Sequence, residues 1–406
     1  MSSIHYDPPS QQSAYRTVFK IPKGVHVVPG TIKVLDIKVN PTGAGGAAST
    51  AYFPALAGVY STVKMVELFV GGKPVDIYQS KQASAFINSL GNQDMQQCIA
   101  SQLTSSSNNI VENLDNVGNA AILTVRQNLN YVAIDSVPAA LELKKMVDYL
   151  ANRYICDEGI DVIITWDSDF ASYCLDSAPA VTAVNIVPGF ISYETVSDDA
   201  AKLYPAQDKV LYRQTIEEQI VVDAIDDKGV DYLQQIQYRL NSLRAKTVLR
   251  SLIVTVPTGE PANTAAVRAT YGKLCSIGQI TPVYQLTVDG QTILTYKGSA
   301  SSAHSLAMTQ QAWGNSSSSV SSWFLPQIPT LVDSANNQLS NYYGYFGVNM
   351  GRYVDKEVVL EFSRRSSSEA NNDGYAAQVA KLQLLMISQV VRMHDVKSGM
   401  ISYPKM

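Results

Sequence analysis

The sequence is poor in the residues that bind metals and cofactors. It has only four cysteines and four histidines among 406 residues. The cysteines lack the Cys-x-x-Cys spacing of zinc and redox sites, and no two histidines stand within a few positions of each other. The residues concerned are Cys98, Cys156, Cys174, Cys275, His5, His26, His304 and His394. We therefore predict free thiols, no metal site and no cofactor.

Catalytic motifs are also missing. No Gly-x-Ser-x-Gly elbow occurs, and the glycine-rich residues 43–46 lack the pattern of a phosphate-binding loop. Adjacent acids occur at 198–199, 217–218 and 226–227, but nothing selects one pair for glycoside hydrolysis. His394 beside Asp395 could be a base with its orienting carboxylate, and an exposed dipeptide explains it equally well. The sequence predicts no catalytic residues and a protein that is not an enzyme.

The chain has neither an excess of positive charge nor a long apolar run. Its net charge is −4, its charged fraction is 16%, and basic residues are scattered. This pattern argues against specific nucleic-acid binding. No run approaches the roughly 18 apolar residues that span a bilayer, and the first residues lack the basic and apolar regions of a secretory signal. We expect a protein without a transmembrane segment that is synthesised in the cytosol.

Strand patterns dominate what is present. Residues 31–39 alternate apolar and polar side chains, as a half-buried strand does. Similar runs are residues 63–70, 121–126, 162–166, 181–187, 247–256, 282–288 and 358–362. Because they do not alternate regularly with helices, an antiparallel sandwich is favoured over a parallel sheet. Only residues 82–103 and 138–159 suggest helices.

An internal repeat divides the chain in two. Residues 67–78 match residues 285–296 as strand, two-residue turn and strand, displaced by 218 positions (286 − 68). The predicted turns are Gly71-Gly72 and Asp289-Gly290, which supply the positive φ angles of a tight hairpin.

Further matches follow in the same order. Residues 35–39 match 252–256, and residues 161–166 match 357–362 with a displacement of 196 (358 − 162). The first unit should therefore carry 22 more residues between its hairpin and its late strands (218 − 196). The predicted division is an arm at 1–14, a first unit at 15–197, a linker at 198–209, a second unit at 210–400 and a tail at 401–406.

One aromatic cluster is denser than a loop requires. It comprises Tyr342, Tyr343, Tyr345 and Phe346. Tyrosine combines apolar area with a polar tip, so the cluster could form a subunit interface or a sugar platform. Ordinary core packing is the interpretation that the sequence favours.

This tandem of β-sandwich units resembles the double jelly-roll major capsid proteins of adenovirus-like, virophage and polinton-like double-stranded DNA viruses. Residues 57–72 are similar to the family's stretch in which a Gly-x-Tyr-Ser turn leads into a strand and hairpin. Residues 15–22 resemble an opening strand after an N-terminal arm. Residues 358–365 and 382–387 resemble the last strands of a second roll.

The resemblance implies an all-β fold of two tandem eight-stranded antiparallel jelly rolls with a few short flanking helices. It also implies a homotrimer with six similar lobes, a pseudo-hexameric tile of an icosahedral virion. Neighbouring tiles, penton proteins and minor capsid proteins would be its partners, and the N-terminal arm would order only on assembly. The alternative function is a two-domain carbohydrate-binding or attachment protein, since β-sandwiches commonly serve as lectins.

Overall fold

The computed structural model describes most strands of both units. The residues that it describes are 2–46, 51–52, 62–79, 139–152, 155–156, 158–168, 175–176, 181–203, 208–222, 232–239, 248–257, 283–297, 331–332, 338–339, 345–349, 358–366 and 382–404. Within these ranges, no helix is both long and apolar enough to cross a membrane. The predicted strand 121–126 and the predicted helix 82–103 lie outside them.

The first unit contains two antiparallel sheets of four principal strands. One has the order β1 (Ser2–Asp7), β14 (Phe190–Val196), β5 (Lys33–Gly43) and β9 (Ala139–Glu142). The other has the order β3 (Arg16–Ile21), β11 (Ile160–Trp166), β7 (Val63–Val70) and β8 (Lys73–Gln79). The minor strands are β2 (Gln11–Gln12), β4 (His26–Val27), β6 (Ala51–Tyr52), β10 (Ile155–Cys156), β12 (Leu175–Asp176) and β13 (Val181–Val187).

The second unit repeats this arrangement. One sheet has the order β15 (Lys209–Val222), β24 (Leu382–Asp395), β17 (Val248–Pro257) and β22 (Tyr345–Asn349). The other has the order β16 (Tyr232–Arg239), β23 (Val358–Ser366), β18 (Val283–Val288) and β19 (Gln291–Lys297). The minor strands are β20 (Leu331–Val332), β21 (Gln338–Leu339) and β25 (Met400–Ser402).

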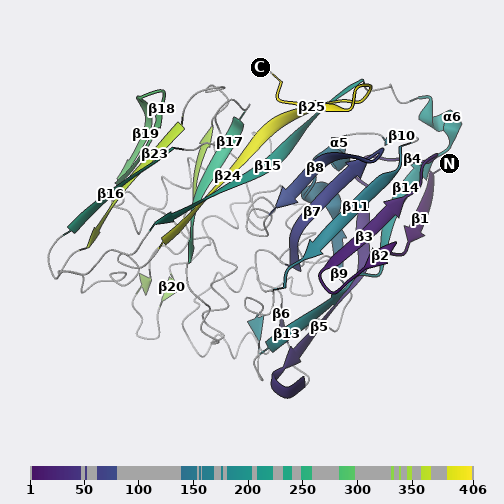
Figure 1. Ribbon diagram of the computed structural model, residues 1–406, viewed down its shortest axis with the longest axis horizontal. Coiled ribbons are helices and arrows are strands. Elements are labelled where there is room, and N and C mark those ends of the chain that lie inside the picture. The colour runs from purple at the N-terminus through teal and green to yellow at the C-terminus, as the bar shows by residue number, and fades with distance from the viewer. Residues whose placement is uncertain are drawn as a thin grey trace.

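The two strand orders correspond one to one. In sequence order, the pairs are β1 with β15, β3 with β16, β5 with β17, β7 with β18, β8 with β19, β9 with β22, β11 with β23 and β14 with β24. Eight strands in two such antiparallel sheets make a jelly roll. The chain is therefore a double jelly roll, and no sheet of the described residues mixes strands of the two rolls. Figure 1 shows the rolls side by side.

The extra length of the first roll lies in two places. Glu142 of β9 pairs with Lys33, and its counterpart Asn349 of β22 pairs with Arg250. Glu142 and Asn349 are displaced by 207 positions (349 − 142), midway between 218 and 196. The first roll thus carries 11 more residues before β9 and another 11 between β9 and β11. Both insertions leave the strand frame unchanged, as loop variation does.

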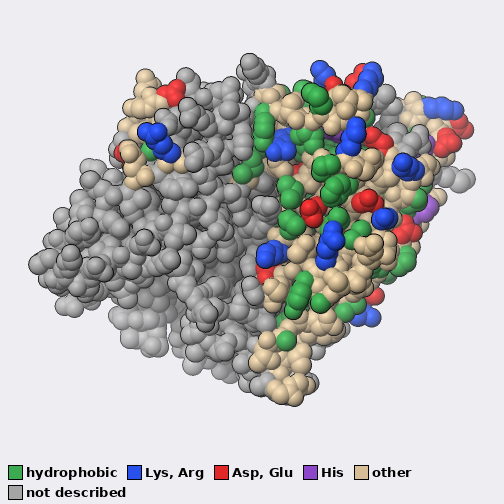
Figure 2. Space-filling model, in the orientation of Figure 1, with side chains coloured by type: hydrophobic (Ala, Val, Ile, Leu, Met, Phe, Trp, Pro, Cys, Tyr) green, Lys and Arg blue, Asp and Glu red, His purple; other side chains and the backbone are tan. Residues whose placement is uncertain are grey.

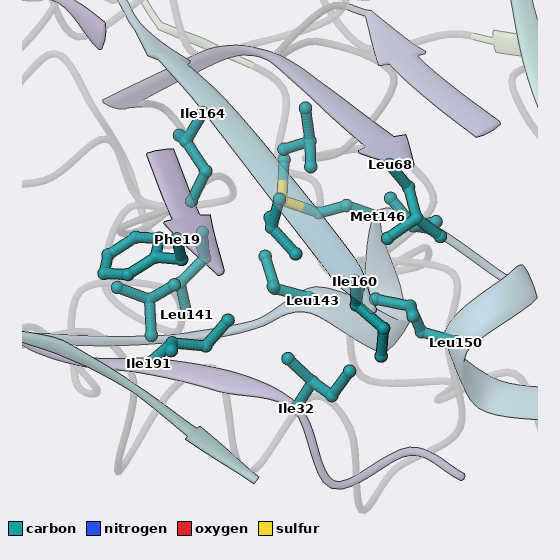
Figure 3. Close-up of a cluster of buried hydrophobic side chains, with 14 of the residues drawn as sticks. Phe19, Ile32, Leu68, Leu141, Leu143, Met146, Leu150, Ile160, Ile164 and Ile191 are labelled. Atoms are coloured by element: carbon teal, nitrogen blue, oxygen red, sulfur yellow. The ribbon is translucent and has the colours of Figure 1, made fainter. Parts of the chain in front are cut away.

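Alternating apolar side chains build the core of the first roll (Figure 3). Ile160, Val162, Ile164 and Trp166 of β11 are all buried on one face of the strand. Such a row removes several large side chains from water, at about 1.5–3 kcal/mol for each fully buried one. The indole N–H of Trp166 donates a hydrogen bond to the buried hydroxyl of Thr17 at 2.8 Å, so the polar atom of this ring is also satisfied.

The N-terminal segment differs from the expected arm. Residues 2–7 form β1 and pair along their whole length with β14 of the same chain. β1 is the counterpart of β15, so the first roll includes these residues instead of starting at position 15. Within the chain, β14 supplies hydrogen-bonding partners for the backbone of these residues. At the other end, β25 pairs with the end of β24 across the expected boundary at 400–401.

The helix predicted at 138–159 is largely wrong. Residues 139–142 form β9, followed by the 3-10 turn η4 (Leu143–Lys145), the single-turn helix α5 (Tyr149–Asn152) and β10. The apolar residues in the first half of this stretch are buried because β9 pairs with β5, so sheet pairing outweighed the helical spacing. The other helical elements described are η1 (Ala44–Gly46) and α6 (Asp198–Ala201).

Candidate functional site: the seam between the two rolls

The four predicted turn residues lie at the tips of two hairpins. Gly71 and Gly72 join β7 to β8 with φ of 59° and 77°, and Asp289 and Gly290 join β18 to β19 with φ of 47° and 77°. A two-residue loop with positive φ at both positions suits the twist of the flanking strands. These turns position the edge strands β8 and β19.

The aromatic cluster is only partly described. Tyr342 and Tyr343 lie outside the described residues, and Tyr345 and Phe346 belong to β22, opposite Val254 and Ile253 of β17. Only the backbone of this pair is described. The assignment of the cluster to a subunit interface therefore stays a prediction.

His394 and Asp395 do not work as a pair. The His394 side chain is buried, and its Nδ1 atom lies 2.9 Å from the hydroxyl of Tyr149. Asp395 accepts a hydrogen bond from the backbone N–H of Ser398, in the turn that leads to β25. Successive residues of a strand point to opposite faces, which separates the imidazole from the carboxylate. Asp395 is therefore not the orienting carboxylate of His394, and the interpretation as an exposed dipeptide is wrong for His394, which is buried.

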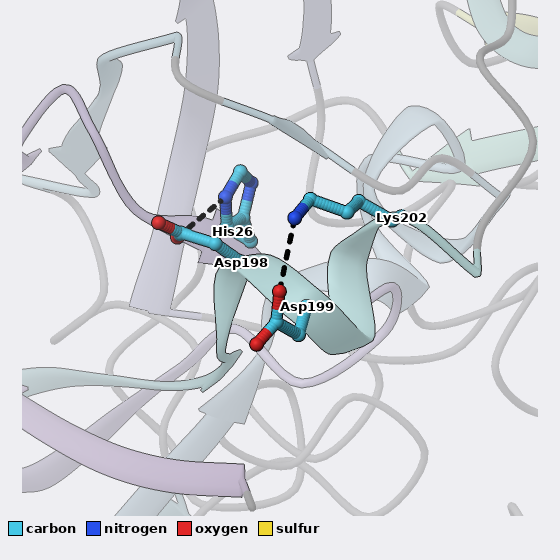
Figure 4. A network of polar contacts seen from close by, with 4 residues as sticks. All are labelled: His26, Asp198, Asp199 and Lys202. Carbon is cyan, nitrogen blue, oxygen red and sulfur yellow. Dashed lines mark hydrogen bonds and ion pairs between the residues drawn. The ribbon is translucent and has the colours of Figure 1, made fainter.

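The adjacent acids at 198–199 contact two different side chains, His26 and Lys202 (Figure 4). The Nε2 atom of His26 lies 3.1 Å from Asp198, and the amino group of Lys202 lies 2.9 Å from Asp199. Both carboxylates are almost fully exposed, so these ion pairs contribute little to stability. The pair does not face a shared space, as two glycosidase carboxylates would. Among the described residues, no group of three potential metal ligands occurs.

Buried polar side chains do converge where the two rolls meet. We call this region the seam: β8 and α5 of the first roll against β15, the end of β24 and the turn to β25 (Figure 1). Val210 and Tyr212 of β15 belong to the hydrophobic core cluster of the first roll. The seam is therefore continuous with that core.

The seam buries both faces of an edge strand. Val75 and Asp76 are successive residues of β8, which lies at the edge of its sheet, and both are buried. Because alternate residues point to opposite faces, β8 must be covered on each side. The second roll provides the second cover: the Tyr212 hydroxyl donates a 2.6 Å hydrogen bond to the carbonyl of Val75.

Side chains from both rolls complete the polar contacts. The Gln214 amide donates to Asp76 Oδ1 at 3.2 Å and to the Ile77 carbonyl at 3.3 Å. The rings of Tyr149 and Tyr212 meet edge to face with centroids 5.1 Å apart. Nearer the surface, Asp148 accepts hydrogen bonds from both the backbone and the guanidinium of Arg213.

The turn between β24 and β25 and the residues after it also contact the seam. Lys73, just after the first hairpin turn, donates to the backbone carbonyl of Ser398 at 3.3 Å. Arg392 donates a 2.6 Å hydrogen bond to the Tyr403 hydroxyl. Its guanidinium also lies over the Tyr403 ring, 4.8 Å from the centroid. Contacts from the last residues of the chain thus reach both the first roll and β24.

Electrostatics make Asp76 the titratable centre of the seam. Burial raises the pKa of Asp76 from 3.8 to about 8, against the Ile77 N–H, the nearby positive charge of Arg392 and the Gln214 amide, which lower it. The negative charge of Asp148 raises it further. Burial likewise raises the pKa of the Tyr212 hydroxyl. Asp76 therefore keeps its proton at neutral pH, and the polar atoms around it connect the two rolls.

Charged side chains are not concentrated in one place on the exposed face of the first roll. Figure 2 shows Lys, Arg, Asp and Glu side chains dispersed among hydrophobic ones over this face. Exposed large hydrophobic residues of the described chain are Ile4, Tyr6, Tyr15, Leu203, Leu211 and Met400.

Comparison with known proteins shows likeness in structure alone. No protein-family model and no curated protein matches the sequence. The chain matches a structure of the Sputnik virophage with a TM-score of 0.61 and 10% identity, over 99% of this chain and 88% of that one. It matches VP54 of PBCV-1, fitted into a reconstruction of Sputnik, with a TM-score of 0.55 and 13% identity over 100% and 97%.

The major capsid protein of mavirus gives a TM-score of 0.51 and 10% identity over 98% of this chain and 89% of that one. These likenesses extend over almost the whole chain, so they cover both rolls and their connection. The fold of this chain is the double jelly roll of these capsid proteins.

Proposed function

We propose that this chain is a major capsid protein whose homotrimers are pseudo-hexameric tiles of an icosahedral shell of a double-stranded DNA virus. The observation that carries the proposal is the seam. It fixes two rolls of the same strand order as one unit, so each chain presents two similar lobes. Three copies around a closed axis then provide six lobes for a six-coordinated lattice position.

The fold supports the same proposal. Jelly rolls occur widely in viral capsids, and the double jelly roll matches structures of three viral sources over nearly the full chain. In the virion, the chain would contact its own copies first and then penton and minor capsid proteins. Synthesis in the host cytosol and a wall that does not bind specific nucleic-acid sequences complete the proposal, in line with the net charge of −4.

Size-exclusion chromatography with light scattering, followed by negative-stain microscopy, tests this function. A capsid tile should elute as a trimer and show particles of hexagonal outline, and shells should form when concentration or salt is raised. A monomer that is retained on a glycan column would contradict the proposal and favour a carbohydrate-binding protein.

A further inference from the structure

The first strand of the chain is a rigid edge with an apolar outer face. β1 pairs over six residues with β14, and its His5 ring stacks on Tyr193 with centroids 5.2 Å apart. His5 Nε2 also lies 2.8 Å from the Thr195 hydroxyl, and the Tyr193 hydroxyl donates to Asp7 at 2.7 Å. These contacts fix the inner face of β1, so the opposite face has a defined position.

That opposite face carries two large exposed side chains. Ile4 and Tyr6 alternate with His5 along β1 and are 57% and 58% exposed. The Tyr6 ring is oriented by an edge-to-face contact with Phe190 on the neighbouring strand, with centroids 5.3 Å apart. No strand of the described residues pairs with the outer edge of β1. An apolar pair on an unprotected edge is typical of a contact surface.

The seam shows what such an edge contacts. Within the chain, β15 is the edge of one sheet of the second roll, and it packs on β8, the edge strand of the first roll. By the correspondence of the rolls, the counterpart of β15 is β1 and the counterpart of β8 is β19. The outer edges of the two rolls, β1 and β19, are therefore of the same two kinds as the edges that meet at the seam. They lie toward opposite ends of the long axis (Figure 1).

We propose that β1 of one copy, through Ile4 and Tyr6, packs against the β19 edge of the next copy. This inference rests on the proposed function and adds to it the surface by which copies join. A head-to-tail contact between two different surfaces closes into a ring when the rotation permits, and three copies with six rolls form such a ring. Like Tyr212 at the seam, Tyr6 has an apolar ring with a terminal hydroxyl that can donate a hydrogen bond.

Introducing positive charges on the outer face of β1 tests the proposal. The double variant Ile4→Lys/Tyr6→Lys should fold but lose trimer, because two unpaired ammonium groups would have to be buried. We expect the apparent dissociation constant of the trimer to rise about a hundredfold or more, measured by mass photometry over a dilution series. The matched control is Leu203→Lys, at an 85% exposed position outside β1, which should leave the trimer unchanged.

Cysteine cross-linking provides a second readout that needs no loss of function. Chains with Tyr6→Cys are mixed with chains with Gln291→Cys, which carry the substitution at an exposed position of β19, and treated with a short bismaleimide. We expect a cross-linked pair containing one chain of each kind, identified by peptide mass spectrometry, above the background of the natural cysteines. If the wild type is a trimer but the cysteine variants form no cross-link between these positions, or if the double variant still forms full trimers, the β1 interface is overturned while the capsid function stands. A monomeric wild type would overturn both.

Discussion

Asp76 is a carboxyl group whose protonation is coupled to the packing of the two rolls. Its pKa is raised by burial to about 8, whereas the unfolded chain should titrate near the ordinary value of 3.8. Between these two values the folded state retains a proton that the unfolded state has lost. The free energy of unfolding must therefore fall as pH rises through this window, by at most about 1.4 kcal/mol per pH unit.

The variant Asp76→Asn should remove this slope. Asparagine keeps an oxygen that can accept from Ile77 and Gln214 but does not ionise. Urea unfolding at several pH values between 5 and 9 measures the effect, with Asp199→Asn at an exposed position as control. We expect a flatter pH dependence for Asp76→Asn and an unchanged one for the control. Parallel curves for wild type and Asp76→Asn would show that Asp76 is not held protonated in the seam.

Tyr212 gives a test of the seam that does not depend on pH. Tyr212→Phe retains the ring contact with Tyr149 but removes the donor to the Val75 carbonyl. Loss of a buried hydrogen bond costs about 1–2 kcal/mol when an acceptor is left unpaired. We expect a stability loss of this size by chemical denaturation, whereas Tyr15→Phe at an exposed position should change little. Equal stabilities of Tyr212→Phe and Tyr15→Phe would show that the hydrogen bond to Val75 does not stabilise the seam.

The hairpin turns can be tested at single positions. A side chain at Gly72 or Gly290 would meet no atom within 4 Å, so any cost of substitution arises from the backbone conformation. Valine should lower stability by about 1–2 kcal/mol or more at either site, because β-branched residues resist positive φ. Asparagine, which tolerates that conformation, is the matched control. If Val and Asn variants melt at the same temperature, the positive φ values do not matter to folding.

At the scale of elements, the C-terminal turn should act as a clamp on the seam. Residues 396–404 contact β8 through Lys73 and β24 through Arg392 and Tyr403. A chain truncated after Asp395 loses these contacts and β25 but keeps the eight principal strands of each roll. We expect it to fold and to expose β8 to faster amide hydrogen exchange than in the full chain, with β11 as the internal reference. Unchanged exchange in β8 would show that the turn does not stabilise the seam.

Strands were predicted from the sequence more reliably than their packing. Residues 181–187 and 63–70 were predicted as strands and form β13 and β7 with those bounds. The stretch at 138–159 could not be read in this way, because spacing alone does not reveal that Ala139 and Leu141 pair with β5. The N-terminal segment was missed for a similar reason, since a short polar strand is defined by its partner β14.

The seam itself could not be located from composition or motif. Asp76 stands in a short strand beside Val75 and Ile77, and sequence does not show that both faces of this edge strand are buried. One available signal is the acid flanked by two apolar β-branched residues, which is unusual on a solvated edge. The partner Gln214 lies 138 positions away, and only the placement of the second roll brings the two side chains together.

At the scale of the whole molecule, the repeat explains both the architecture and the proposed assembly. Internal matches of a few hydrophobic residues predicted two units, and the structure shows eight corresponding strands in each. The length differences fall between the corresponding principal strands, so the strand order that builds each lobe is the same in both halves. What sequence could not provide is which edges are joined within the chain and which stay open.

The most direct test of this account is the mass of the purified, full-length protein under native conditions. The account predicts one dominant species at three times the chain mass of 44.1 kDa, stable on dilution to micromolar concentration. A species at the mass of one chain, at every concentration and salt condition, would contradict it.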